Sequence, residues 1–125
     1  MPETVSHKHE CQAIVVSCMD HRLRSFLRKW TIANISEGFD RVAIAGGVKN
    51  LPFVVEQIDL SVKLHNIKEA YLINHGDCGA YGAEGTFEKN KEDLLFAKKI
   101  LQHKFPRLKI ILFYLKLNGE FVKIL

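Results

Sequence analysis

The hydrophobic residues of this 125-residue chain follow two alternating patterns. Four short runs are almost continuously apolar and rich in β-branched residues: QAIVVSC at 12–18, RVAIAG at 41–46, EAYLINH at 69–75 and KIILFYL at 109–115. Runs of this kind are typical of strands that are covered on both faces, as they are in parallel sheets. The pattern therefore predicts four strands.

Between these runs, three stretches repeat their apolar residues every three or four positions, which is the spacing of one helix face. They cover residues 20–30, 51–66 and 88–104, and Pro52 is acceptable in the first turn of the second. The residues that form the apolar faces are Leu23, Phe26, Leu27 and Trp30; Val54, Val55, Ile58 and Val62; and Leu94, Ala97, Ile100 and Leu101. Helices are therefore expected to alternate with the strands.

The dipeptide Asn118-Gly119 is a strong hairpin signal, and it predicts a further strand antiparallel to the fourth. The whole order favours an α/β fold with a mostly parallel sheet, helices on both faces and an added antiparallel edge strand. We expect residues 1–125 to form one domain, with a polar N-terminal arm at residues 1–11.

Charge and cysteine content narrow the possible functions. The net charge is +4, from 18 basic and 14 acidic residues, but the basic residues are spread along the chain without interleaved aromatic residues. Solvated helix faces are therefore expected, and nucleic acid is not expected as a partner. Three cysteines without disulfide spacing, a polar N-terminus and no apolar run of membrane-spanning length predict a cytoplasmic protein without a membrane partner.

Three residues at predicted strand ends carry the candidate chemistry. Cys18 ends the first strand, His75 ends the third, and Cys78 lies in the loop beyond it. The loops after parallel strands open on one edge of the sheet, so the three side chains converge if the first and third strands are neighbours. Two thiolates and an imidazole suit Zn²⁺, and three protein ligands leave one position open, as in catalytic zinc sites. Cys11 is expected to be an ordinary free thiol.

Asp20 and Arg22 follow Cys18 at alternate positions. In a purely structural interpretation, Asp20 interacts favourably with the dipole at a helix N-terminus, and Arg22 is a solvent-exposed residue without a role in the site. In a functional interpretation, Asp20 accepts a hydrogen bond from a zinc-bound water or competes for the open position. Arg22 then holds the carboxylate away from the metal by a bidentate pair.

The motif Cys18-x-Asp20-x-Arg22, followed by Ala45-Gly46-Gly47 and by His75-x-x-Cys78-Gly79, resembles the β-class carbonic anhydrases. The resemblance runs from about residue 12 to the end of the chain. It implies a sheet in the order 2-1-3-4, one zinc ion per chain and a homodimer or higher homo-oligomer with active sites near the subunit interface. It also implies reversible hydration of carbon dioxide to bicarbonate and a proton by zinc-bound hydroxide, with Asp20 and Arg22 orienting or gating it.

The chain departs from the family pattern in three places. Ala43 and Ile44 stand where the family carries an arginine and an asparagine, so an anion contact from that arginine is absent. The family's helical N-terminal arm is expected to be reduced or missing. The segment after Gly79 does not align with the family sequence, and Tyr81, Phe53 and Phe87 are apolar candidates for the pocket.

Other functions stay open on the same residues. Related folds with these zinc ligands hydrolyse carbon disulfide or carbonyl sulfide, and a zinc-binding relative without activity would serve as a sensor or interaction module. The spacing Cys18-x5-Arg24 is also that of a cysteine phosphatase loop. The phosphatase interpretation is disfavoured because the loop has no glycine, Asp20 would repel phosphate, and His75 and Cys78 have no role in it.

Overall fold

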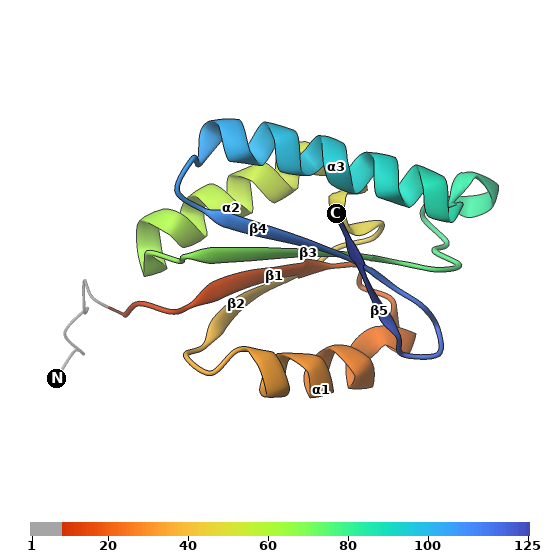
Figure 1. Cartoon of the computed structure of the whole chain (residues 1–125), viewed down its shortest axis with the longest axis horizontal. Coiled ribbons are helices and arrows are strands. Elements are labelled where there is room, and N and C mark those ends of the chain that lie inside the picture. The colour runs from red at the N-terminus through yellow and green to blue at the C-terminus, as the bar shows by residue number, and fades with distance from the viewer. Residues whose placement is uncertain (1–8) are drawn as a thin grey trace, which may run out of the picture.

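The computed structural model describes residues 9–125, and its central element is a five-stranded sheet in the order β2-β1-β3-β4-β5. The first four strands run parallel to one another, and β5 is antiparallel to β4 (Figure 1). The strands are β1 Ala13–Ser17, β2 Phe39–Ala43, β3 Glu69–His75, β4 Lys109–Leu115 and β5 Phe121–Ile124. The predicted α/β fold, with its 2-1-3-4 order and antiparallel edge strand, is confirmed.

Helices cover both faces of the sheet: α1 lies on one face, and α2 and α3 lie on the other (Figure 1). Their bounds are α1 Arg24–Asn34, α2 Leu51–His65 and α3 Phe87–Lys104. Short 3-10 turns precede them, η1 His21–Leu23, η2 Gly47–Lys49 and η3 Gly82–Glu84. The Thr86 hydroxyl caps α3 by accepting a hydrogen bond from the Lys89 amide, and Asn66 ends α2 in the left-handed conformation.

Alternation along the strands divides the core into two layers. Ile14 and Val16 of β1 face α2 and α3, whereas Ala13 and Val15 face α1. All five residues of β1 are buried, because successive side chains of a strand point to opposite faces and both faces are covered. The central strands therefore hold their carboxyl ends in fixed positions.

A cluster of aromatic side chains packs α1 against β3, β4 and β5 of the sheet. The Trp30 ring lies 5.0 Å from that of Tyr71 and 5.3 Å from that of Phe113, both edge-to-face, and it stacks on Phe121 at 5.4 Å. Such aromatic pairs contribute about 0.5 to 1.5 kcal/mol each beyond the area that they bury. The hairpin that places Phe121 is therefore part of the core beneath α1.

Three sequence expectations differ from the structure. β2 ends at Ala43 rather than at residue 46, because Gly46 and Gly47 adopt positive φ values of 81° and 56° that begin a turn. The first helix continues to Asn34, and its first residues form the separate turn η1. Ile100 is 39% exposed, so the buried face of α3 consists of Asn90, Leu94, Ala97 and Leu101.

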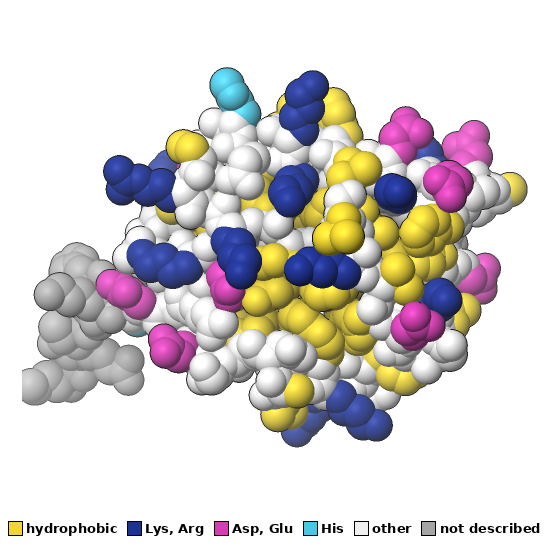
Figure 2. Space-filling model, viewed as in Figure 1, with side chains coloured by type: hydrophobic (Ala, Val, Ile, Leu, Met, Phe, Trp, Pro, Cys, Tyr) yellow, Lys and Arg dark blue, Asp and Glu magenta, His cyan; other side chains and the backbone are white. Residues whose placement is uncertain are grey.

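Figure 2 shows Lys and Arg side chains spread singly over one face of the molecule, with hydrophobic side chains gathered in its middle. Among residues 9–125, none of the helices is long and apolar enough to cross a membrane. The expectation of one domain stays a prediction. The polar N-terminal arm lies for the most part outside the described residues, because the description begins at His9.

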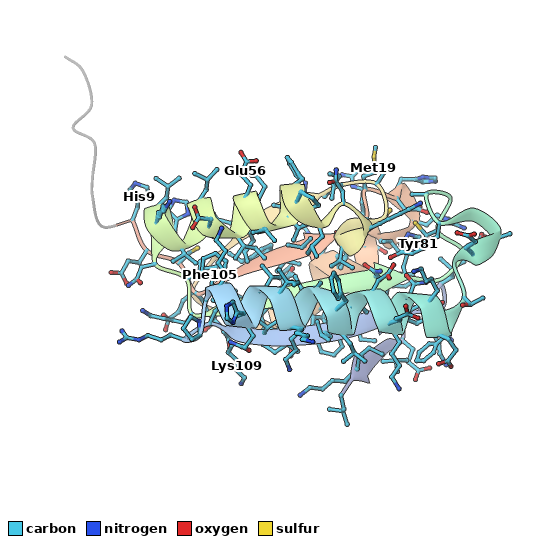
Figure 3. All side chains as sticks on the ribbon, turned by 90° about the horizontal axis from the view of Figure 1, so that it is seen from above. His9, Met19, Glu56, Tyr81, Phe105 and Lys109 are labelled. Carbon is cyan, nitrogen blue, oxygen red and sulfur yellow. The ribbon has the colours of Figure 1, made fainter. Side chains whose placement is uncertain are left out.

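The two ends of the sheet carry different residues. Figure 3 shows Met19 and Tyr81 at the carboxyl end of the parallel strands, and His9 and Lys109 at the opposite end. Met19 directly follows the first candidate ligand, Cys18, and Tyr81 closely follows the third, Cys78. The candidate site therefore lies at the carboxyl end of the parallel strands.

Replacing Gly119 by alanine is expected to destabilise the fold by about 2 kcal/mol, because a Cβ atom strains the left-handed backbone. Gly119 has a φ of 95°, and its added Cβ would lie 2.7 Å from the Phe26 ring. Urea unfolding of Gly119→Ala measures the loss. Gly79→Ala is the matched control, since nothing lies within 4 Å of its added Cβ. Equal stability of the two variants would contradict this account of the hairpin.

Candidate metal centre

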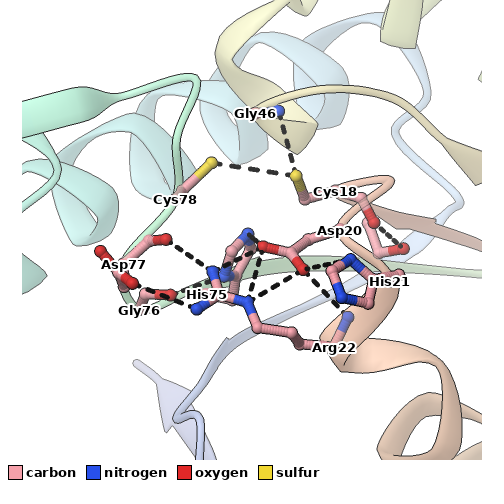
Figure 4. Close-up of polar contacts among 10 residues, drawn as sticks. Cys18, Asp20, His21, Arg22, Gly46, His75, Gly76, Asp77 and Cys78 are labelled. Atoms are coloured by element: carbon pink, nitrogen blue, oxygen red, sulfur yellow. Dashed lines mark hydrogen bonds and ion pairs between the residues drawn. The ribbon is translucent and has the colours of Figure 1, made fainter.

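The carboxyl ends of β1 and β3 bring three metal-ligating side chains together. Parallel pairing sets Ser17 opposite Ile73, so Cys18 comes out of β1 beside the last residues of β3. His75 is the final residue of β3, and Cys78 follows in the next turn. One ligand atom from each of Cys18, His75 and Cys78 lies within 4.8 Å of the other two (Figure 4). The convergence follows from the strand order, as parallel topology requires.

The two sulfur atoms face each other in a buried setting. The Sγ atoms of Cys18 and Cys78 lie 3.8 Å apart, and both thiols are free. The Gly46 amide donates a hydrogen bond of 3.3 Å to the Cys18 sulfur. Burial raises the pKa of the Cys18 thiol, the amide acts in the opposite sense, and the neighbouring Cys78 raises it further. Without a cation, the site therefore disfavours the thiolate form that binds metals.

His75 presents an unpartnered nitrogen to the same space. Its side chain is 1% exposed, and Nδ1 lies 2.7 Å from the Gly76 carbonyl oxygen. Because a carbonyl only accepts, Nδ1 carries the proton and Nε2 keeps a free lone pair. Nε2 is buried and has no hydrogen-bond partner among the described residues. Burial also lowers the pKa of His75, which favours the neutral, metal-binding imidazole.

These observations fit a zinc ion. Two sulfurs at about 2.3 Å from one tetrahedral zinc lie about 3.8 Å apart, and the sulfurs of Cys18 and Cys78 are already at 3.8 Å. A ring nitrogen whose other nitrogen is bound to a carbonyl is the usual form of a metal-ligating histidine. A buried lone pair without a donor is costly, and a metal ion would satisfy it.

Asp20 stands beside the trio and is held by Arg22. The Arg22 guanidinium donates to Asp20 from Nε at 3.1 Å and from Nη2 at 2.7 Å, and the Arg22 amide donates a further bond at 2.9 Å. These hydrogen bonds hold the pKa of Asp20 well below its usual range and raise the pKa of Arg22. One Asp20 oxygen lies 3.9 Å from the Nε2 atom of His75. The carboxylate is therefore ionised and adjacent to the candidate ligands.

Arg22 has a second acidic partner, Asp77. It donates to the Asp77 carboxylate at 3.1 Å and to the Asp77 carbonyl at 2.9 Å. Asp77 has a φ of 54°, so the turn between His75 and Cys78 curls back toward Arg22. The guanidinium thus joins the loop after β1 to the loop after β3.

A buried hydrogen-bond network lies next to the candidate ligands, around Asn74, which directly precedes His75. Asn74 donates to the Tyr81 hydroxyl at 3.1 Å and to Asn90 at 2.9 Å, and its own oxygen accepts from the Val48 amide. The Tyr81 hydroxyl donates to Asp93 at 2.7 Å. Sequence reasoning missed Asn74 and Asn90. The available signal was a polar residue at the end of the apolar run in β3.

The glycine loop approaches the centre closely. Gly46 donates to the Cys18 sulfur, and a Cβ atom at Gly47 would lie 2.7 Å from the side-chain oxygen of Asn74. This loop is therefore a turn that needs glycine, and it also shapes the site.

A cavity of about 640 Å³ opens beside Cys18 and Asp20, between β1, β2 and the start of α1. Its lining includes four arginines: Arg22, which binds Asp20, and Arg24, Arg28 and Arg41. The apolar pocket candidates do not line it: Tyr81 is buried in the polar network, and Phe53 and Phe87 lie 38% and 36% exposed on other elements. This expectation was made from side-chain type alone, and the polar network and the loop path place these rings elsewhere.

Comparison with known proteins agrees with this geometry. Residues 8–125 match the family model described as "Putative carbonic anhydrase". The chain belongs to the β-carbonic anhydrase family. Two Rickettsia proteins of uncharacterised function are relatives. The one from Rickettsia conorii is 30% identical to this chain, and the alignment covers 92% of this chain and 75% of the relative. The one from Rickettsia bellii is 29% identical, and the alignment covers 89% of this chain and 80% of the relative.

Solved structures of the β-carbonic anhydrase fold resemble the chain at low sequence identity. A carbonic anhydrase from Streptococcus mutans has a TM-score of 0.70 at 16% identity and covers 100% of this chain and 88% of that one. A β-carbonic anhydrase from Trichomonas vaginalis has a TM-score of 0.72 at 15% identity, covering 99% and 88%. A carbon disulfide hydrolase has a TM-score of 0.67 at 14% identity, covering 94% and 80%. Family and fold neighbours together support an enzyme of the β-carbonic anhydrase superfamily.

Replacing Asn74 by alanine is expected to destabilise the protein by about 3 kcal/mol, because it leaves buried hydrogen-bonding groups unsatisfied. The affected partners are the Val48 amide, the Tyr81 hydroxyl and the Asn90 side chain. Urea unfolding of Asn74→Ala measures the change. The control is Asn34→Ala, an exposed asparagine with one hydrogen bond to Trp30, which should change stability by about 0.5 kcal/mol or less. Similar effects at both positions would rule out a supporting role for the network.

Proposed function

We propose that Cys18, His75 and Cys78 bind one zinc ion, and that the chain catalyses the reversible hydration of carbon dioxide to bicarbonate and a proton. The observation that carries the proposal is the buried Nε2 atom of His75, which has no hydrogen-bond partner among residues 9–125. His75 offers a ligand atom within 4.8 Å of the sulfurs of Cys18 and Cys78. Membership of the carbonic anhydrase family supports the reaction class.

Zinc bound by these residues supplies a Lewis acid that lowers the pKa of a coordinated water, to roughly 7 where three histidines hold the metal. Two thiolates donate more negative charge than two imidazoles, so a less acidic water and activity weighted to alkaline pH are expected here. Cys18 and Cys78 are the source of this difference.

Asp20 orients the reacting water in this proposal. Its ionised carboxylate only accepts hydrogen bonds, and one of its oxygens lies 3.9 Å from the His75 nitrogen that faces the metal position. An O–H group near that nitrogen would donate to Asp20 and thereby turn its lone pair toward the substrate carbon. Arg22 keeps the carboxylate from approaching the metal itself, and release of the Asp20–Arg22 pair would close the site.

The adjoining cavity gives the substrate a route to Cys18 and Asp20. Its arginines place positive charge where a bicarbonate anion would leave, although Ala43 and Ile44 replace the family's arginine and asparagine. Arg24, Arg28 and Arg41 therefore stand in for the missing anion contact in this proposal.

Hydrolysis of carbon disulfide or carbonyl sulfide is the second candidate function. The likeness to a carbon disulfide hydrolase favours it, because that protein shares the fold over 94% of this chain. The substrates are linear triatomic molecules like carbon dioxide, so the same ligand set and carboxylate would serve both reactions. Assays with each substrate distinguish the two candidates.

We further propose that the chain assembles as a homodimer or higher homo-oligomer in the cytoplasm. The exposed hydrophobic side chains in the middle of the face in Figure 2 are consistent with a covered surface. Light scattering at several concentrations tests the assembly. A monomer at all of them would contradict it.

Stopped-flow hydration of carbon dioxide tests the activity directly. Zinc-loaded protein is expected to turn over carbon dioxide, with a rate that rises with pH and a midpoint not below about 7. Cys18→Ser is expected to lose at least about a hundredfold in kcat/KM. Cys11→Ser is the matched control, since Cys11 lies outside the centre and should leave the rate unchanged.

Three outcomes would change the assignment. Zinc binding without turnover of carbon dioxide or its sulfur analogues would mean a sensor or interaction module. Turnover of carbon disulfide alone would favour the second candidate. Full carbon dioxide turnover by Cys18→Ser would contradict the zinc site.

Arg22→Lys is expected to lower kcat/KM by about tenfold or more, because lysine keeps the positive charge but loses the fork that holds Asp20 by two nitrogens. In the native protein Nε and Nη2 both donate to that carboxylate, so the loss tests its orientation rather than its charge. Zinc content is measured alongside, and it should stay unchanged. A lysine variant as active as the native protein would contradict the orienting role.

A further inference from the structure

A second group of metal-ligating side chains lies at the other end of the sheet. Cys11, Asp40 and His65 each offer a ligand atom within 4.8 Å of the other two. Cys11 precedes β1, Asp40 lies near the start of β2, and His65 is the last residue of α2. Three separate segments therefore supply a sulfur, an oxygen and a nitrogen to one place.

This group is tightly connected. The Nδ1 atom of His65 and the Ser61 hydroxyl each lie 2.6 Å from the same Asp40 oxygen. The Cys11 amide donates to the His65 carbonyl at 3.1 Å, which fixes the backbone of Cys11 against the end of α2. The side chains of His65 and Asp40 are 25% and 30% exposed, so an ion from solvent can reach them.

A second imidazole lies beside His65, outside the group of three close ligand atoms. The ring of His9 lies 4.8 Å from the ring of His65, edge-to-face. His9 is exposed and is two residues before Cys11 on the same segment. Figure 3 shows His9 at the end of the molecule opposite Tyr81, so this group is remote from the centre at Cys18.

The charges around Cys11 favour a cation. Burial raises the pKa of the Cys11 thiol, and the negative charge of Asp40 raises it further. A divalent ion between the two groups would reverse both effects, because it stabilises the thiolate and the carboxylate together. The free thiol that the sequence suggested is thus placed where a metal would deprotonate it.

We propose that Cys11, Asp40 and His65, with His9 as an additional ligand, form a second site for a divalent transition-metal ion of the zinc type. The site would clamp the segment before β1, the edge strand β2 and the end of α2 to one another. Mixed sulfur, nitrogen and oxygen ligands are an accepted set for zinc. This site is independent of the proposed activity at Cys18.

Binding requires a small local change. The Asp40 oxygen and the His65 nitrogen are at hydrogen-bond distance, 2.6 Å, whereas two such ligands on one tetrahedral zinc lie about 3.3 Å apart. The ion would take the place of the hydrogen bond between Asp40 and His65, with the ring proton of His65 on Nε2, and the Cys11 thiol would lose its proton. Proton release and a pH-dependent affinity follow.

Cobalt titration of a Cys18→Ser, Cys78→Ser double variant tests the site, because Cys11 is then the one cysteine left in the chain. We expect one cobalt ion per chain and a thiolate-to-cobalt charge-transfer band. Adding Cys11→Ser should abolish the band, and adding His65→Gln should weaken binding by about tenfold or more. His103→Gln, an exposed histidine on α3, is the matched control and should change neither.

A folded double variant that shows no charge-transfer band would overturn the proposal, as would one that keeps the band after Cys11→Ser. Far-ultraviolet circular dichroism establishes whether the double variant folds. If it does not, zinc content of the full native chain gives the answer: two ions per chain are expected, falling to one in Cys11→Ser. Equal zinc content in native protein and Cys11→Ser would equally refute the second site.

Discussion

Parallel pairing between β1 and β3 is the constraint on which the candidate centre depends. Residues 17 and 73 lie opposite each other in neighbouring strands, although 55 intervening residues separate them along the chain. The crossover through α1, β2 and α2 brings the carboxyl ends of two buried strands to one edge. Cys18 and His75 then leave those ends side by side, and neither needs a long loop to reach the other. Both faces of the strands are covered, so the positions of the two ligands follow from the packing of the core.

The burial that fixes the positions of the candidate ligands also favours their neutral forms and leaves one histidine nitrogen without a hydrogen-bond partner among the described residues. Desolvation raises the pKa of the Cys18 thiol and lowers that of His75, so both groups are disposed to be neutral without a cation. The imidazole then keeps one lone pair that no described donor fills. A divalent ion would resolve all three features at once, because it would stabilise thiolates and accept the nitrogen lone pair. Asp20 differs from them, since Arg22 keeps it ionised at the mouth of the site.

Much of this arrangement was predictable from the sequence, and the reasons for the misses are physical. The strand-end positions of Cys18, His75 and Cys78 follow from runs of buried residues, which carry a strong signal. The Arg22–Asp77 contact depends on a left-handed turn at Asp77, and no pattern in the sequence specifies it.

The second metal-ligating group was missed for a related reason. β2 lies at the edge of the sheet and begins at Phe39, two residues before its apolar run, so the polar Asp40 was not read as a strand residue. Its position opposite Ile14 of β1, beside Cys11 and His65, emerges only from the register of that edge. β2 is only partly buried, so its apolar pattern is too weak to predict where the strand begins. The group at Cys11, Asp40 and His65 therefore could not be predicted from the sequence.

The most direct test of the central claim is zinc X-ray absorption spectroscopy on Cys11→Ser protein loaded with one equivalent of zinc. The account predicts a four-coordinate ion with two sulfur ligands at about 2.3 Å and nitrogen or oxygen ligands at about 2.0 Å. A spectrum with no sulfur, or with a single sulfur, would contradict the convergence of Cys18, His75 and Cys78 on one metal ion.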